Sequence, residues 1–381
     1  MMLRQAQHNI MRTHLFLVLI FSILCFQQTF SQTEKPVRIG IDGLSHDHIH
    51  GLLKDYGERL DIQIVGIAEK NKELVKRLAE RYNFNTDLVY DDLEMMVAKA
   101  KPQGVVAFNS IYDHLHTVEV CAPLGIHVMV EKPLAVSVAH ANRIAELAQK
   151  YNIMVLTNYE TSWYPTNRKA FEMAVSDNEI GAINKVLIND GHKGPVEIGC
   201  SGEFLAWLTD PILNGGGAVI DFGCYGANLM TWLMKNETPE SVTAILQTIK
   251  PDVYPKVDDQ ATIILKYKNA QAIIQGSWNW PVDRKDMEIY GVAGYVKVLD
   301  ANNFEYRLKR EVPAVTLQLT ELPALENEPF NYFANLINGK LQIKPTDLAS
   351  LENNLIVVKI LEAAKESART GKTEIYVIEK E

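Results

Sequence analysis

The protein has 381 residues, of which 47% are hydrophobic and 22% are charged, and its formal net charge is -9. This composition is too apolar for a disordered chain, and it lacks the excess of Lys and Arg that binding to nucleic acid or to an anionic membrane requires. The length is sufficient for about two domains, each with its own core. Four cysteines are too few for a disulfide scaffold, so buried free thiols are expected.

Residues 1–31 have the pattern of a secretory signal peptide. Arg4 and Arg12 precede an apolar run over residues 15–26, and Ser31 supplies a small residue for cleavage. The run is shorter than the roughly 20 residues that a transmembrane helix needs. We therefore expect cleavage, no stable membrane span in the mature chain, and a periplasmic or secreted protein. An uncleaved anchor is the alternative.

Residues 35–156 alternate short apolar runs with amphipathic stretches. Strands are expected at 37–42, 62–68, 104–108, 126–130 and 153–156, with helices after residue 43 and at 71–82, 114–124 and 137–151. Strands that are almost continuously apolar and alternate with helices predict a parallel sheet covered on both faces, which is an α/β domain.

The pattern changes in residues 157–345. A helix is expected at 165–175, a strand at 182–189, a helix after Gly217, repeated strands over 241–300 and late helices at 329–338 and 347–369. Strands separated by turn signals predict an open, mostly antiparallel sheet, and so an α+β second domain. Gly371 ends the last helix.

The turn after the first strand keeps part of the glycine pattern of a dinucleotide-binding loop. Gly43 fits, Ser45 is small enough for a pyrophosphate to approach, and His48 stands where a glycine is usual. Glu69 closes the second strand, where a carboxylate can accept hydrogen bonds from ribose hydroxyls and repel a 2′-phosphate. NAD is therefore favoured over NADP. A solvated glutamate at the strand end is the alternative.

His46, His48 and His50 alternate behind the first strand. Two such histidines can ligate zinc. No His or Asp ligands are apparent at later strand ends, so we expect no metal. The preferred interpretation is a set of histidines in a loop and at a helix start, near an anionic ligand.

Three residues could carry acid/base chemistry. Lys132 follows the strand at 126–130, and ligands of parallel sheets bind beyond this end of the strands. A lysine there can hydrogen-bond a substrate hydroxyl and stabilise a developing alkoxide. Asp221 and Tyr225 are four residues apart, so we expect them on one helical face. A surface lysine and a capped helix start with a core tyrosine are the alternatives.

Together these motifs resemble the Gfo/Idh/MocA oxidoreductase family over about residues 35–374. The resemblance rests mainly on Glu131-Lys132-Pro133 and on Asp221-x-Gly223-x-Tyr225. It implies a Rossmann domain, an antiparallel sheet domain, and a last helix, within 346–381, that returns to the first domain. It also implies a homodimer or homotetramer.

The resemblance implies roles for individual residues. Lys132 contacts the reacting hydroxyl, Asp221 orients substrate or catalyst, and Tyr225 occupies the acid/base position, as in the exported glucose–fructose oxidoreductase branch. The Lys132–Pro133 peptide bond is expected to be cis. The residues expected to bind the cofactor are Gly43, Ser45, His46, His48, Glu69, Asn109, His114, Glu131 and Lys132.

Candidate substrate contacts lie after the first domain. His192 and Lys193 follow a strand, and the aromatic residues that could stack on sugar rings are Tyr159, Trp163 and Trp207. The leading hypothesis is an exported nicotinamide-dependent oxidoreductase that acts on a secondary alcohol of a sugar, sugar derivative or polyol with a tightly held cofactor. The alternatives are an NAD-dependent glycosidase or lyase with no net redox change, and a sugar-binding protein that has lost its cofactor.

Overall fold

A computed structural model describes residues 35–55 and 57–375 of the chain. The expected signal peptide, residues 1–31, lies outside the described residues. Within the described residues, no helix has both the length and the apolarity to cross a membrane.

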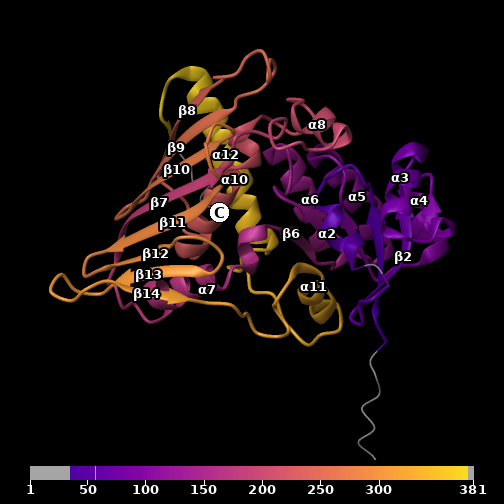
Figure 1. Ribbon diagram of the computed structural model, residues 1–381, viewed down its shortest axis with the longest axis horizontal. Helices are drawn as coiled ribbons and strands as arrows, with labels where there is room; N and C mark the ends of the chain where they lie inside the picture. Colours follow the sequence, from indigo (N-terminus) through magenta and orange to yellow (C-terminus); the bar gives the residue numbers. More distant parts are fainter. Residues whose placement is uncertain (1–34, 56, 376–381) are drawn as a thin grey trace, which may run out of the picture. The chain divides into compact units, whose positions relative to one another are not determined.

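The first domain contains a six-stranded sheet, sheet A, in the order β3-β2-β1-β4-β5-β6 (Figure 1). All of its strand pairs are parallel, and this is the strand order of a Rossmann fold. The strands are β1 (Val37–Asp42), β2 (Ile62–Ala68), β3 (Val89–Tyr90), β4 (Gly104–Ala107), β5 (His127–Glu131) and β6 (Val155–Asn158). Two apolar clusters each contain residues of these strands, and they confirm that the parallel sheet is buried.

Helices connect these strands. They are α2 (Ile49–Lys54), α3 (Lys72–Tyr82), α4 (Leu93–Ala100), α5 (His114–Cys121) and α6 (Val138–Tyr151). Asn71 and Ser137 cap α3 and α6, which begin one residue after each cap. The sequence-based prediction omitted α4 and β3, because β3 has two residues and α4 follows it directly.

The second domain contains a nine-stranded sheet, sheet B, in the order β14-β13-β12-β11-β7-β10-β9-β8-β15 (Figure 1). Only β7 and β10 pair in parallel, so the predicted mostly antiparallel sheet is confirmed. The strands are β7 (Ile183–Gly191), β8 (Ser241–Gln247), β9 (Gln260–Lys266), β10 (Gln271–Ser277), β11 (Arg284–Gly291), β12 (Tyr295–Val298), β13 (Asn303–Arg307), β14 (Val315–Gln318) and β15 (Glu374–Ile375).

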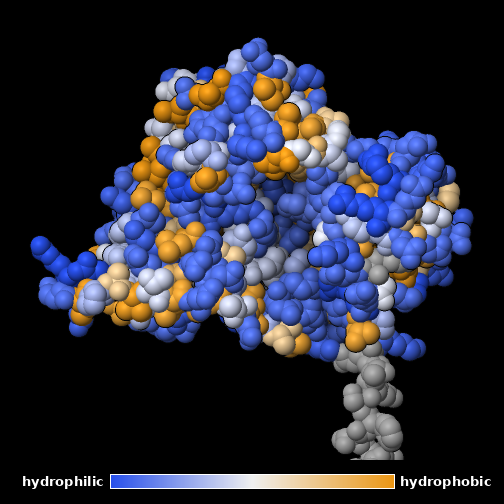
Figure 2. All heavy atoms as spheres, viewed as in Figure 1, coloured by the Kyte–Doolittle hydropathy of each residue, from blue (hydrophilic) through white to orange (hydrophobic). Residues whose placement is uncertain are grey.

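Helices cover one face of sheet B, where α10 packs on β10 and α12 packs on β8. The helices after β6 are α7 (Pro165–Phe171), α8 (Gly202–Leu208), α9 (Ala218–Asp221), α10 (Gly223–Leu233), α11 (Pro329–Ile337) and α12 (Leu351–Thr370). The other face exposes Ile245 and Ile264. Figure 2 shows hydrophobic residues recurring over the part of the surface where Figure 1 labels sheet B.

The segment 346–381 was expected to return to the first domain. Its helix α12 contacts α6 and β6 of that domain, and it also packs against β8 and α10 of the second domain. Val358 belongs to a core cluster of sheet A and Leu361 to the core of sheet B. The helix therefore joins the two cores, and β15 extends sheet B.

Candidate active site

Lys132 lies just beyond the carboxyl end of β5, and the Lys132–Pro133 peptide bond is cis, as expected. The lysine is buried, and its Nζ donates a hydrogen bond to the carbonyl oxygen of Asp221 at 2.9 Å and another to the Asp221 carboxylate. The second carboxylate oxygen accepts a hydrogen bond from Trp278 Nε1 at 2.8 Å. Asp221 therefore holds Lys132 through two acceptors and is itself fixed by Trp278.

The prediction that Asp221 and Tyr225 share one helical face is wrong. The helix α9 ends at Asp221, and α10 begins at Gly223. In a continuous helix the Asp221 carbonyl would accept the amide of Tyr225, but that amide donates to Phe222 at 3.2 Å. The freed carbonyl accepts from Lys132 instead. The break in the helix thus supplies one of the two acceptors of the lysine.

The glycine run before α9 permits a close backbone approach. The carboxylate of Asp258 accepts hydrogen bonds from the amides of Gly217, at 2.8 Å, and Val219, at 2.7 Å. A Cβ at residue 217 would lie 1.8 Å from the Asp258 carbonyl oxygen. Only glycine fits there, and the aspartate satisfies the free amides at the start of α9.

The Lys132–Asp221 pair is ionised. Burial alone would lower the pKa of Lys132, but the adjacent Asp221 carboxylate raises it above its ordinary value. Burial alone would raise the pKa of Asp221, but Lys132 outweighs this and holds it below its ordinary value. The site therefore presents a fixed ammonium group at neutral pH.

Tyr225 lies beside this pair and is 1% exposed. The ammonium nitrogens of Lys132 and Lys285 lie 5.2 and 5.1 Å from the centre of its ring, and Tyr159 packs edge-on at 5.4 Å. Burial, and then the negative charge of Glu160, raise the pKa of Tyr225 well above its usual range. The phenol is therefore protonated at neutral pH.

Asp190, Glu160 and Lys285 belong to the surroundings of Tyr225 and were not predicted. Asp190 is the penultimate residue of β7, is 1% exposed, and has a buried Oδ1 with no hydrogen-bond partner among the described residues. Burial raises its pKa well above the usual range in spite of the nearby Lys285. Its place directly before Gly191 and His192, at the end of a predicted strand, was the available signal.

The loop after β1 has the features of a phosphate-binding turn. Gly43 has a φ of +81°, and a Cβ there would lie 2.8 Å from the Asn109 Cβ. The amides of Ser45 and Asp47 donate to no residue that the structure describes, whereas that of Leu44 donates to Glu69. These two free amides lie in the loop before α2 and can donate to an anionic phosphate, whereas the first amides of α2 already donate to the backbone.

Glu69 and His114 retain acceptors for the rest of a dinucleotide. The Glu69 oxygens accept from the amides of Leu44, at 2.9 Å, and Asn71, at 2.8 Å, and each oxygen has a lone pair left for a ribose hydroxyl. Burial lowers the pKa of His114 to about 4, and its Nδ1 faces the Leu134 carbonyl at 3.2 Å. Its buried Nε2 has no partner within the described part of the chain. These residues fit a nicotinamide dinucleotide.

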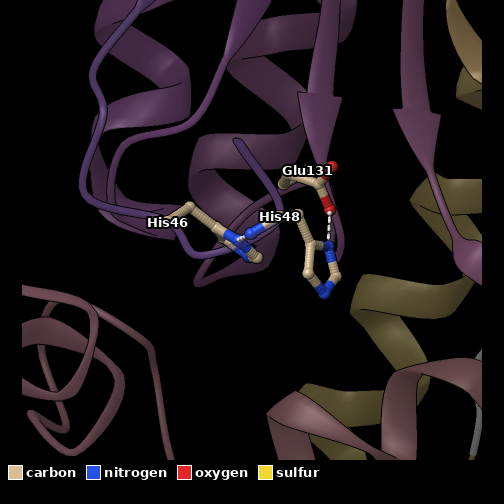
Figure 3. A group of neighbouring side chains, drawn as sticks. All are labelled: His46, His48 and Glu131. Carbon is tan, nitrogen blue, oxygen red and sulfur yellow. Dashed lines mark hydrogen bonds and ion pairs between the residues drawn. The ribbon is translucent and has the colours of Figure 1, made fainter. Parts of the chain in front are cut away.

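His46, His48 and Glu131 meet beside this loop (Figure 3). His48 Nδ1 lies 2.9 Å from Glu131 Oε2, and Glu131 Oε1 accepts from Asn158 Nδ2 at 2.8 Å. His46 is buried, with its ring 4.6 Å from that of Phe204. His48 is 41% exposed.

Asn109 is oriented by a half-buried carboxylate at the end of β1. Its Nδ2 donates to Asp42 at 2.9 Å, and the Thr117 hydroxyl donates to the same oxygen at 2.6 Å. Burial raises the pKa of Asp42 from 3.8 to about 6. Because the folded chain binds this proton more tightly than the unfolded chain, the free energy of unfolding falls as pH rises from about 4 to about 6.

Asp42→Asn is expected to stabilise the protein by about 2 kcal/mol at pH above 7, and the gain should vanish below a pH of about 4. The amide keeps an acceptor for Asn109 and Thr117 but carries no charge to bury. Urea unfolding of both proteins across this pH range measures the difference. A pH-independent difference, or a loss of stability at high pH, would contradict the assignment.

The structure separates the predicted substrate residues. His192 lies near the Lys132–Asp221 pair, because the charges of both residues act on its pKa. Burial is the main cause of the lowered pKa of His192. Lys193 is exposed. Substrate stacking on Tyr159 and Trp207 is wrong: Tyr159 is 0% exposed and Trp207 5%, because they pack against Tyr225 and His46.

Trp163 lines a different cavity. Its Nε1 donates to Asn158 at 2.9 Å, and its ring faces Tyr332. The cavity has a volume of about 530 Å³, and Trp232 and Asp347 are among its other lining residues. Lys132 does not line it.

Known proteins are similar to both halves of the chain. The family described as "Oxidoreductase family, NAD-binding Rossmann fold" matches residues 37–159, and the "GFO/IDH/MocA C-terminal domain" matches 169–297. Trans-1,2-dihydrobenzene-1,2-diol dehydrogenase of Xenopus tropicalis is 27% identical over 63% of this chain and 68% of its own length. D-xylose 1-dehydrogenase [NADP(+)] of Haloarcula marismortui is 23% identical over 91% of this chain and 95% of its own length.

Solved structures share the fold. The aldose-aldose oxidoreductase from Caulobacter crescentus, complexed with glycerol, matches with a TM-score of 0.75 and 20% identity. The match covers 90% of this chain and 100% of that one.

Proposed function

Because this chain belongs to the GFO/IDH/MocA family of oxidoreductases, we propose that it oxidises or reduces a secondary alcohol position of a sugar, sugar derivative or polyol. The observation that carries the proposal is the buried Lys132–Asp221 ion pair, with Tyr225 beside it, at the carboxyl edge of the Rossmann sheet. Ligands of such sheets bind at this edge.

A bound nicotinamide dinucleotide would supply the hydride acceptor or donor for this reaction. Gly43 and the free amides of Ser45 and Asp47 would hold its phosphates, and Glu69 its ribose hydroxyls. His114 Nε2 would accept a hydrogen bond from it. These contacts leave Lys132 and Tyr225 for the substrate.

Lys132 and Tyr225 have different tasks in this scheme. The Lys132 ammonium hydrogen-bonds to the reacting oxygen and stabilises its negative charge, and Asp221 keeps the ammonium in place. Tyr225 exchanges the proton of that oxygen. Because its pKa is raised, the resting site holds two proton donors, which is the state that carbonyl reduction requires. Alcohol oxidation needs the phenolate, which the raised pKa of Tyr225 disfavours at neutral pH, so this direction should gain from higher pH.

We propose NAD as the cofactor, with Glu69 as the residue that disfavours NADP. Replacing Glu69 with Gln removes the negative charge that repels a 2′-phosphate, while the amide oxygen can still accept the Leu44 amide. The preference for NAD over NADP should narrow by about tenfold or more. Titration of each cofactor by fluorescence measures it. An unchanged preference would show that another residue selects the cofactor.

The expected signal peptide supports a further part of the proposal. We infer that the mature protein works in the periplasm or outside the cell, as the exported glucose–fructose oxidoreductase branch does. Little free NAD exists there, so the cofactor would stay bound and be recycled by a second substrate. The exposed apolar face of sheet B, with Ile245 and Ile264, supports a homodimer or homotetramer.

The reaction is tested with aldoses, polyols and glycosides. Each is mixed with the protein, and the reduced nicotinamide is followed by absorbance together with product analysis by chromatography. Oxidation of one alcohol position coupled to reduction of the nicotinamide, or of a second sugar, is expected. Bond cleavage without net redox change would instead assign a glycosidase or lyase. Binding of a sugar with no turnover would assign a binding protein.

A further inference from the structure

We propose that His46, His48 and Glu131 form a binding site for a divalent transition-metal ion. Their candidate ligand atoms all lie within 4.8 Å of one another. The two histidines come from the loop after β1 and the glutamate from the end of β5, so the parallel sheet brings them together (Figure 3). Two imidazoles and one carboxylate are a common ligand set for Zn²⁺, Mn²⁺ and Fe²⁺.

The spacing suits one ion. Metal–ligand distances of about 2.0–2.1 Å place neighbouring ligand atoms about 3 Å apart and opposite ones about 4 Å apart. His48 Nδ1 and Glu131 Oε2 are 2.9 Å apart, which matches neighbouring ligands. The other separations reach up to 4.8 Å, so an ion would draw the three side chains closer together.

The candidate ligand atoms are hydrogen-bonded to one another, and an ion would replace these bonds. His46 Nδ1 accepts the His48 amide at 3.2 Å, and His48 Nδ1 pairs with Glu131 Oε2 at 2.9 Å. Binding of an ion therefore removes the proton between His48 Nδ1 and Glu131 and breaks the bond from the His48 amide to His46. The other nitrogen of His48 points away from Glu131 and can take the ring proton (Figure 3).

The local charge favours a cation. The charge of Lys132 is matched by Asp221, which leaves the negative charge of Glu131 without a full counter-charge. Neighbouring side chains hold the ligands in place, since Asn158 donates to Glu131 Oε1 and the ring of Phe204 packs on His46. Such supporting contacts are typical of metal sites.

The proposal does not depend on the redox function, because metal binding is measured in the absence of nucleotide. Untagged protein is dialysed against EDTA, then against buffer, and titrated with ZnCl₂ and with MnCl₂ by calorimetry. One saturable ion per chain is expected for at least one of the two metals. His48→Ala and Glu131→Gln should each weaken that binding at least about tenfold.

His116→Ala is the matched control. His116 also lies beside a glutamate, Glu94, at 3.5 Å, but both are exposed and no third ligand is near them in the described chain. This variant should bind the ion as the unchanged protein does. Circular dichroism confirms that His48→Ala, at a half-exposed position, remains folded. Absence of saturable binding, or equal binding by all four proteins, would overturn the proposal.

Discussion

Replacing Lys132 with methionine is expected to lower kcat/KM by about a thousandfold or more in the proposed reaction. The ammonium is the only buried cation that contacts Asp221 in the described chain, and methionine keeps the bulk of the stem without a charge or a donor. Steady-state kinetics with the best substrate of the wild-type protein measures the loss. Turnover within tenfold of wild type would contradict the assignment of Lys132.

The same change leaves Asp221 buried without its counter-charge, so the variant should lose about 3 kcal/mol of stability. The double variant Lys132→Met/Asp221→Asn removes both charges and should recover part of that stability, while turnover stays low. Lys297→Met is the matched control. Lys297 also pairs with a carboxylate, Glu288 at 3.2 Å, but on strands of sheet B away from the site. It should retain wild-type turnover.

Replacing Tyr225 with phenylalanine is expected to lower kcat by about a hundredfold. The ring stays in contact with Tyr159 and the two lysines, and within the described residues its hydroxyl makes no hydrogen bond that the change would break. Stability should therefore stay close to that of the wild type. Kinetics as a function of pH measures the role of the hydroxyl.

The pH profile separates proton exchange from packing. Because the pKa of Tyr225 lies well above its usual range, wild-type alcohol oxidation should rise as pH increases, and this rise should flatten in Tyr225→Phe. Tyr159→Phe is the control, since that hydroxyl is buried beside the Cys224 thiol. It should change neither kcat nor its pH dependence by more than about twofold. An unchanged profile in Tyr225→Phe would exclude the proton role.

Much of the fold could be predicted from local pattern. Apolar runs marked β1 and β2 to the residue, although each strand has an exposed polar residue, Arg38 or Gln63, at its second position. The helix α8 and the strands β13 and β14 were not predicted. The first is short and lies in a glycine-rich stretch, and the two strands carry mostly polar residues near the edge of sheet B.

The site was only partly predictable. The position of Lys132 after a strand indicated its place, but the break between α9 and α10 depends on a contact with a residue 89 positions away. The burial of Tyr159 could not be read from its aromatic side chain. The third member of the histidine cluster, Glu131, lies 83 residues from His48 and is brought to it only by the order of strands in the sheet.

We propose that the loop after β1 and the Lys132 site bind a nicotinamide dinucleotide. Purified mature protein is denatured, and the released small molecules are identified by mass spectrometry; protein stripped of them is then titrated with NAD and NADP. We expect released NAD, and saturable binding of added NAD that is tighter than that of NADP. No nicotinamide in the extract, together with no binding of either cofactor, would contradict a nicotinamide site in this protein.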